Sequence, residues 1–91
     1  MNTVMGTLFH TSIPEIMEAM MNSSGPLFAN EIAERTGLDC SGVLKILKRL
    51  RSKGLTTRWK DGDLRWILTP TGREVAVIIV RCKDRLEEVL G

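Results

Sequence analysis

The chain has 91 residues, of which 43% are hydrophobic and 26% are charged, and its formal net charge is +2. A chain of this length is typical of one small domain without a large enzymatic cleft, and the composition is that of an ordinary globular protein, which indicates neither disorder nor a membrane span. The longest apolar run, residues 75–80, is much shorter than the roughly 20 residues of a membrane-spanning helix, so we expect a single domain over 1–91 without membrane contact.

The first ten residues include Val4, Met5, Leu8 and Phe9, and this segment suits either an arm or an extension of the first helix. It lacks the basic and long apolar regions of a secretory signal, so we expect a cytoplasmic protein. The next residues, from Ser12 to Glu15, have the S-x-x-E pattern of a capping box, and Pro14 suits a first helical turn. They predict a helix whose apolar stripe comprises Ile13, Ile16, Met17, Met20 and Met21.

Residues 30–55 carry the clearest structural pattern in the chain. Ile32 and Ala33 open an apolar face that Gly37 interrupts. After this break, large apolar side chains recur with the i, i+3, i+4, i+7 spacing of a helix face, and they are Val43, Ile46, Leu47 and Leu50. The pattern predicts a helix-turn-helix, in which the small side chain of Ala33 lets the second helix cross close to the first.

The ends of these two helices also have local signals. The first helix is expected to begin at residue 28 or 29 and to end at Thr36. The second is expected over residues 40–52, with Asp39 accepting hydrogen bonds from its first turn and Gly54 ending it. The helix-turn-helix therefore spans about residues 28–53.

Two short alternating segments predict a β-hairpin over residues 55–68, to which Leu27 and Phe28 could add an edge strand. Its turn is expected at either Asp61-Gly62 or Gly62-Asp63, and both positions give the same division of faces. One face is expected to join the core, and it carries Thr57, Trp59, Leu64, Trp66 and Leu68. The other face is expected to group three cations on one side, and it carries Arg58, Lys60, Arg65 and Ile67.

The last predicted helix spans about residues 70–90, with Thr69 as its N-cap and Pro70 in its first turn. Apolar residues within it are spaced like the seam of a coiled coil, and they are Val75, Ile79, Cys82, Leu86 and Val89. Because its first half is apolar nearly all round, it must be covered on more than one side. A chain this small has little left for that purpose, so we expect a homodimer formed through this seam.

Positive charge is concentrated in one part of the chain. Residues 35–73 contain ten basic and three acidic residues, a net charge of +7, whereas the remaining residues carry −5. This segregation favours the docking of a polyanion on one face of the protein.

Together these elements resemble a winged helix-turn-helix, with local sequences similar to those of MarR-like bacterial and archaeal regulators. The similar stretches, within residues 27–75, are EIAERTGL, SGVLKILKRLRSKGL, WKDGDLRW and LTPTGRE. The resemblance implies a mainly α fold in which the hairpin is the wing and the last helix forms a dimer. It also implies a regulator of transcription, expected to be a repressor, that binds double-stranded DNA in a sequence-specific way.

An α-helix fits the major groove of DNA, and the second helix of the helix-turn-helix would enter it. The residues outside its apolar face are Ser41, Gly42, Lys45, Lys48 and Arg49. We expect Ser41 and Lys45 at base edges and Lys48 and Arg49 at phosphates, while Gly42 permits close approach of the backbone. By the resemblance, the wing lies along the adjacent minor groove or the backbone, where its three cations supply charge.

Other functions have less support in the sequence. An adaptor module with the same fold would use the basic face to bind an acidic protein instead of DNA. The sequence contains no catalytic nucleophile with a matching general base, no phosphate-binding loop and no cluster of metal ligands. We therefore expect that the protein is not an enzyme and binds no metal and no cofactor. Cys40 and Cys82 have no paired spacing and are expected to be free thiols. Nothing in the sequence identifies a small-molecule effector.

Overall fold

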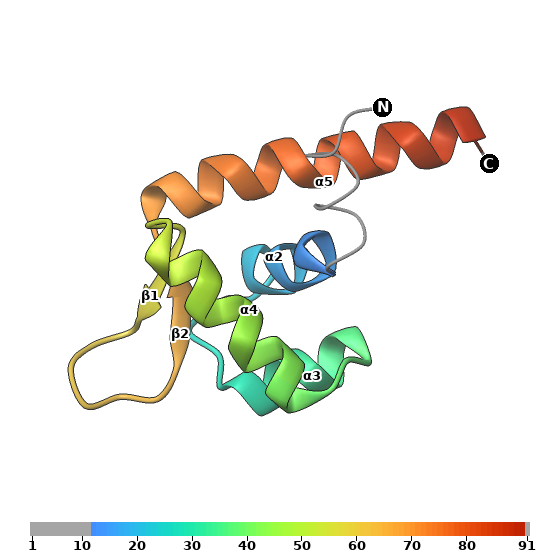
Figure 1. Ribbon diagram of the computed structural model, residues 1–91. Helices are drawn as coiled ribbons and strands as arrows, with labels where there is room; N and C mark the ends of the chain where they lie inside the picture. The colour runs from blue at the N-terminus through green and yellow to red at the C-terminus, as the bar shows by residue number, and fades with distance from the viewer. Residues whose placement is uncertain (1–11, 91) are drawn as a thin grey trace.

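The computed structural model describes residues 12–90, which form four helices and a two-stranded antiparallel sheet (Figure 1). In chain order, the elements are α2 (Ile13–Met21), α3 (Ala29–Thr36), α4 (Cys40–Ser52), β1 (Thr56–Arg58), β2 (Trp66–Leu68) and α5 (Pro70–Leu90). This order confirms the predicted mainly α fold with a small hairpin. The alternatives predicted for residues 1–10 lie outside the described residues. None of the helices within 12–90 has the length and apolar character that crossing a membrane requires.

Helix α2 begins differently from the prediction. Ser12 has φ 61° and ψ 14°, in the left-handed region, and its side chain makes no capping hydrogen bond. An N-cap side chain reaches the first turn from an extended backbone, so the predicted capping box from Ser12 to Glu15 is wrong. Pro14 does lie in the first turn, where its missing N–H costs no helical hydrogen bond.

Helices α3 and α4 form the helix-turn-helix, and both have the predicted bounds. Gly37 ends α3 with φ 73°, and Gly54 follows α4 with φ 76°, a backbone conformation that residues with a Cβ rarely adopt. After Gly54, the N–H of Leu55 donates to the carbonyl oxygen of Leu50 at 3.0 Å. This bond pairs one of the carbonyls that the end of a helix leaves free, so α4 ends sharply before the wing.

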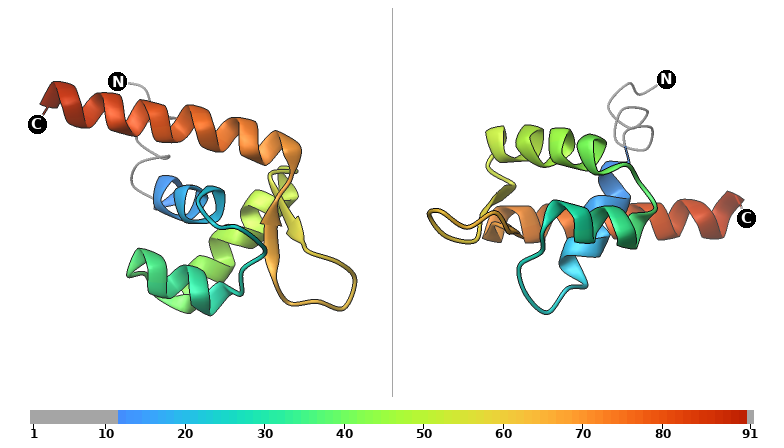
Figure 2. Two further views of the ribbon diagram at one scale, coloured as in Figure 1. Left: turned by 180° about the vertical axis from the view of Figure 1, so that it is seen from behind. Right: turned by 90° about the horizontal axis from the view of Figure 1, so that it is seen from below.

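The core lies where α2 crosses between α5 and the helix-turn-helix (Figures 1 and 2). Helix α2 contributes Ile16 and Met17, and α4 contributes Val43 and Leu47, all of them fully buried. Trp66 of β2 is the largest fully buried side chain in the described chain. Burial of one face of α4 in this core leaves the opposite face of that helix in solvent.

The wing has a different register from the predicted one. Its cross-strand pairs are Thr56 with Leu68, Thr57 with Ile67 and Arg58 with Trp66. Beyond them, the N–H of Trp59 donates to the carbonyl oxygen of Arg65 at 2.9 Å, and Gly62, with φ 81°, lies at the centre of the turn. A change of one residue in register moves side chains to the opposite face. Trp59 therefore lies on the opposite face from Trp66.

This register explains the exposure of Trp59, whereas Leu64 is on the face of Trp66 but lies beyond the paired strands, near the turn. Trp66 and Leu68 are buried as predicted, but Trp59 is 45% exposed and Leu64 is 66% exposed. The predicted core positions of Trp59, Leu64 and Thr57 are therefore wrong. Thr56 takes the buried place, and its hydroxyl donates to the carbonyl oxygen of Leu47 in α4 at 2.9 Å.

An edge segment also pairs with β2, as the sequence suggested. The N–H of Leu27 donates to the carbonyl oxygen of Trp66 at 3.0 Å, and the N–H of Trp66 donates back at 2.7 Å. The pairing is a single bridge rather than a strand. It fixes the start of α3 to the wing.

Helix α5 begins as predicted, and its first turn forms a joint with the end of α4. The hydroxyl of Thr69 accepts from the N–H of Gly72 at 2.9 Å and donates to the carbonyl oxygen of Gly54 at 2.7 Å. A Cβ at Gly72 would overlap the carbonyl oxygen of Leu55. Gly54, Leu55, Thr69 and Gly72 therefore form a close-packed joint between α4, the base of the wing and α5.

The predicted seam of α5 is divided between the core and the surface. Ile79 is only 6% exposed and Val75 packs against the same core, because α2 already covers this half of α5. The prediction that Ile79 faces a second copy is therefore wrong, whereas Val75 is half-buried and its place in the seam stays a prediction. Cys82 is half-buried, and Leu86 and Val89 are exposed beyond α2.

Candidate nucleic-acid interface

The outward face of α4 is basic. Ser41, Lys45, Lys48 and Arg49 are exposed and Gly42 is half-buried. This face exists because Val43, Leu47 and Leu50 recur with the period of the helix and are buried in the core on its opposite side. Within residues 12–90, neither Lys45, Lys48 nor Arg49 forms an ion pair. Their charges are therefore available to an outside partner.

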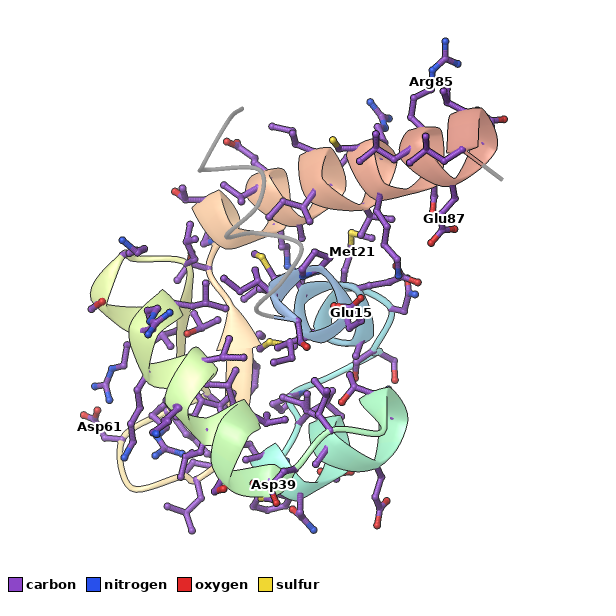
Figure 3. The ribbon with its side chains drawn as sticks, turned by 45° about the vertical axis from the view of Figure 1, so that its right-hand side comes forward. Glu15, Met21, Asp39, Asp61, Arg85 and Glu87 are labelled. Carbon is purple, nitrogen blue, oxygen red and sulfur yellow. The ribbon has the colours of Figure 1, made fainter. Side chains whose placement is uncertain are left out.

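The start of α4 carries a fixed negative charge, at Asp39. Its carboxylate accepts from the hydroxyl of Ser41 and, at 3.2 Å, from the N–H of Gly42, which confirms the predicted N-cap. The Ser41 hydroxyl, followed by the Gly42 N–H, holds the pKa of Asp39 below its ordinary value, so the carboxylate is ionised at neutral pH. Figure 3 shows Asp39 at this end of α4 and Asp61 on the wing loop.

The three wing cations do not share one side as predicted. The guanidinium of Arg58 donates to the carbonyl oxygen of Leu64 at 2.6 Å and lies 4.0 Å from the centre of the Trp66 ring. Arg58 is thus on the same face as Trp66, because they are a cross-strand pair. Arg65 points to the other face, and Lys60 is exposed near the turn.

Asp63 holds Arg65 in place, a role that the sequence analysis missed. The carboxylate of Asp63 accepts from the Arg65 side chain at 2.7 Å and from the Arg65 backbone N–H at 2.8 Å. Mainly because of the side-chain bonds, the pKa of Asp63 falls to about 2, and the same bonds raise the pKa of Arg65. The signal in the sequence is the D-x-R spacing after the turn, since neighbours two apart on a hairpin share a face.

A shallow apolar groove of about 240 Å³ separates the wing from the starts of α3 and α4. Its lining residues are Phe28, Ala29, Asn30, Cys40, Leu44, Arg58, Leu64 and Trp66. Cys40 is an exposed free thiol there, and the described residues contain no group of His, Cys, Asp or Glu that could hold a metal ion. The groove places the wing and α4 on two sides of one continuous surface.

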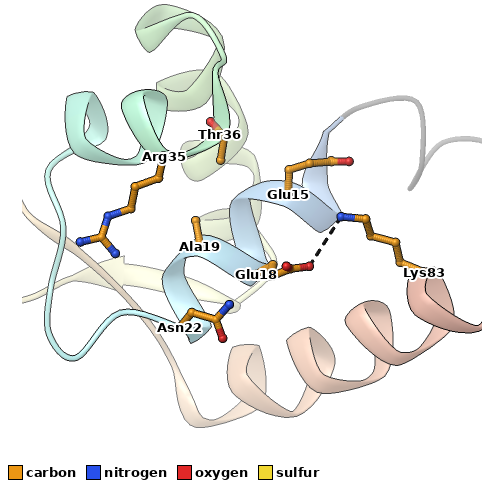
Figure 4. Close-up of a pocket in the computed structure, with 7 residues that line it drawn as sticks. All are labelled: Glu15, Glu18, Ala19, Asn22, Arg35, Thr36 and Lys83. Atoms are coloured by element: carbon orange, nitrogen blue, oxygen red, sulfur yellow. Dashed lines mark ion pairs between the residues drawn. The ribbon is translucent and has the colours of Figure 1, made fainter. Parts of the chain in front are cut away.

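A second cavity, of about 380 Å³, lies away from this surface, between α2, the end of α3 and α5 (Figure 4). Glu18 of α2 and Lys83 of α5 form an ion pair across it at 3.6 Å. Arg35 of α3 and Glu15 of α2 also line it. The ion pair joins α2 to α5 beyond the apolar core.

No protein-family model matches the sequence, and neither does any curated protein. Solved structures do match. The MarR family transcriptional regulator SPO1453 from Silicibacter pomeroyi DSS-3 matches with a TM-score of 0.73 and 21% identity over 88% of this chain. MepR, a transcription regulator of the Staphylococcus aureus multidrug efflux pump MepA, matches with a TM-score of 0.68 and 22% identity over 85% of this chain. The chain has the winged-helix fold of MarR-family regulators.

The share of each similar protein's length that this chain covers differs among the matches. The chain spans 58% of the length of SPO1453 and 59% of MepR. By contrast, it spans 93% of a putative DNA-binding protein from Ralstonia eutropha JMP134, with a TM-score of 0.62 and 25% identity over 75% of this chain. The chain therefore corresponds to somewhat more than half of each of the two regulators and to nearly all of the Ralstonia protein.

Proposed function

We propose that this chain is a sequence-specific DNA-binding regulator of transcription that acts as a homodimer and represses the promoter it occupies. The observation that carries the proposal is the outward face of α4, whose three cations have no ion-pair partner within residues 12–90. A helix held this way by its apolar face suits the major groove. The similar structures, which include transcription regulators and a putative DNA-binding protein, support the proposal. Residues 1–91 act as one winged-helix domain.

The residues of α4 have different roles in this complex. Lys45, one turn into the helix, reaches base edges, and Lys48 and Arg49 hold phosphates. Ser41 donates its hydroxyl proton to Asp39, so its oxygen acts toward DNA as an acceptor. Gly42 has no protein atom within 4 Å of where its Cβ would be, so the fold does not require a glycine there. Its role is to let the DNA approach the backbone.

The wing contributes unequal cations to the adjacent minor groove or backbone. Lys60 is exposed, and Arg65 is held by Asp63 with a third of its side-chain surface still open. Both contact DNA directly. Arg58 is engaged with Trp66 and the Leu64 carbonyl, so it contributes mainly to the positive field.

The homodimer uses the second half of α5. Cys82, Leu86 and Val89 stay in the proposed interface, and Ile78, 66% exposed, extends the same helix face by one turn. A two-fold pair of winged helices presents two recognition helices to half-sites about one helical turn apart. Sedimentation at micromolar concentration should give a dimer, and Leu86→Glu should give a monomer. A monomeric native protein at that concentration would exclude this interface.

Fluorescence anisotropy tests the DNA-binding function. The purified protein is titrated into a labelled duplex from its own upstream region and into a random-sequence duplex, at about 50 and 200 mM salt. We expect tighter binding to the upstream duplex and steep weakening with salt, because bound phosphates release counterions. Absence of binding at either salt concentration would contradict the proposal and favour an adaptor that binds an acidic protein.

A further inference from the structure

Two large apolar side chains are exposed near the turn of the wing. Trp59 precedes the turn and is 45% exposed, and Leu64 follows it and is 66% exposed. One exposed apolar side chain is ordinary on a protein surface. Two of them beside the same turn are informative, because this turn lies farther from the core than any other part of the hairpin (Figure 1).

Trp59 and Leu64 lie on opposite faces of the hairpin. Leu64 lines the apolar groove together with Arg58 and Trp66, so it is on their face. Trp59 follows Arg58 by one residue and pairs through its N–H with Arg65, so it is on the other face. The wing tip, residues 59–64, therefore presents an apolar side chain on each side of a turn whose centre, Gly62, has none.

A cation accompanies each of these apolar side chains. Arg65, held by Asp63, is opposite Trp59 in the hairpin, and Lys60, which is exposed, precedes the turn on the side of Leu64. A partner that contacts the wing tip must therefore offer negative charge next to apolar surface on both sides. The sugar-phosphate strands on the two sides of a DNA minor groove have this chemistry, because their deoxyribose C–H groups lie beside phosphates.

We infer that the wing tip binds the DNA minor groove, with Trp59 against the sugars of one strand and Leu64 against those of the other. The inference rests on the proposed DNA-binding function and adds two contact residues to it. Lys60 and Arg65 supply the adjacent phosphate contacts. Apolar side chains also contact DNA in other proteins that bind the minor groove.

The two tryptophans of the chain provide a direct test. Trp66 is 1% exposed, so quenching of intrinsic fluorescence by acrylamide reports mainly on Trp59. The variant Trp59→Phe gives the baseline of Trp66 alone. Adding a saturating unlabelled duplex to the native protein should lower the acrylamide quenching constant to near this baseline. If Trp59 stays equally accessible while anisotropy shows full binding, the inference is wrong.

Variants at the tip separate an apolar contact from a charged one. Trp59→Ala should weaken DNA binding about tenfold and Leu64→Ala about threefold, as is typical for truncated interface side chains. Neither should change the dependence of affinity on salt, because no counterion is released at an apolar contact. Lys60→Ala is the matched control at the same tip, and it should lower the salt slope by about one.

The failures of the two proposals are distinguishable. Absence of DNA binding by the native protein would overturn the proposed function and this inference together. Full binding by Trp59→Ala and Leu64→Ala would overturn only the wing contacts. Loss of Trp59 accessibility as the protein is concentrated without DNA would assign the tip to a second copy and would also overturn the inference. Circular dichroism of each variant confirms that its fold is intact.

Discussion

Helix α4 and the wing carry similar numbers of cations but make them available in different ways. Lys45, Lys48 and Arg49 of α4 have no ion-pair partner within residues 12–90, whereas Arg65 of the wing is paired with Asp63. Arg58 of the wing is engaged with Trp66. The difference shows that a basic residue in the sequence can be engaged within the protein and so be less available to bind DNA. In our proposal, α4 supplies most of the attraction to DNA, and the wing supplies positioned contacts.

Substitution of Gly72 should have the largest effect, because α4 and the wing depend on the same joint. Gly72→Ala places a Cβ on the Leu55 carbonyl oxygen, where backbone must move. We expect the free energy of unfolding to fall by about 3 kcal/mol or more, as for other strained backbone contacts. Unfolding in urea measures this change in the free energy of unfolding. Gly25→Ala is the control, since nothing lies within 4 Å of its added Cβ. Equal free energies of unfolding for the two variants would show that the backbone at Leu55 moves aside at little cost.

The next largest effect tests the dominance of α4. The double variant Lys45→Ala and Lys48→Ala should weaken binding to the upstream duplex about 30-fold and lower the salt slope by one to about two. Unfolding should be little changed, because both side chains are exposed. Arg81→Ala removes an exposed cation from α5 and should leave the affinity nearly the same. Unchanged affinity of the double variant would show that α4 is not the recognition helix.

A smaller effect is expected from the positioned wing cation. Asp63→Asn releases Arg65, so the ratio of affinities for the upstream and random duplexes should fall several-fold, without weaker binding to the random duplex. The pKa of Asp63 is lowered from 3.8 to about 2. The ion pair is therefore complete above about pH 4 and is lost only as the pH falls through 2. Discrimination by the native protein should accordingly be constant from about pH 5 to 8, and a change in this range would contradict the role of Asp63.

The smallest effect should come from the one glycine inside α4. Gly42→Ala meets no protein atom within 4 Å, so it should raise the free energy of unfolding by about 0.5–1 kcal/mol. DNA affinity should fall about threefold if the duplex approaches this backbone, because the added methyl group separates the two. Urea unfolding and anisotropy on the same preparation measure both. Higher stability with unchanged affinity would remove Gly42 from the interface.

The sequence predicts α4 more accurately than it predicts the wing. The bounds of α4 follow from signals within a few residues of its ends, at Asp39 and Gly54, and both are confirmed. The faces of the wing depend instead on the number of residues in the turn. The turn lies at Asp61-Gly62, one of the two predicted positions, but the strands pair Trp59 with Arg65, and this register placed Trp59 on the face opposite Trp66. Leu64 stays on the face of Trp66 but is exposed.

Two further errors have other causes. The seam of α5 has the spacing of an interface between copies, but spacing cannot say which element covers it. In the structure, α2 covers Ile79. Ser12 has a capping sequence, but its left-handed backbone prevents the cap. The outward residues of α4 were predictable because the helix period alone divides its two faces, whereas the Asp63–Arg65 pair is signalled only by a two-residue spacing, which does not by itself show that the two side chains bond.

The closure of the wing at its base has an evolutionary consequence. The bonds from Thr69 to Gly54 and Leu55, at 2.7 and 3.1 Å, close the hairpin at the end that meets α4 and α5. The segment from Trp59 to Leu64 takes no part in this closure. Insertions, deletions and substitutions there can therefore accumulate without moving the recognition helix. A lineage of such proteins can acquire new target sites by remodelling the loop while it inherits the rest of the scaffold unchanged.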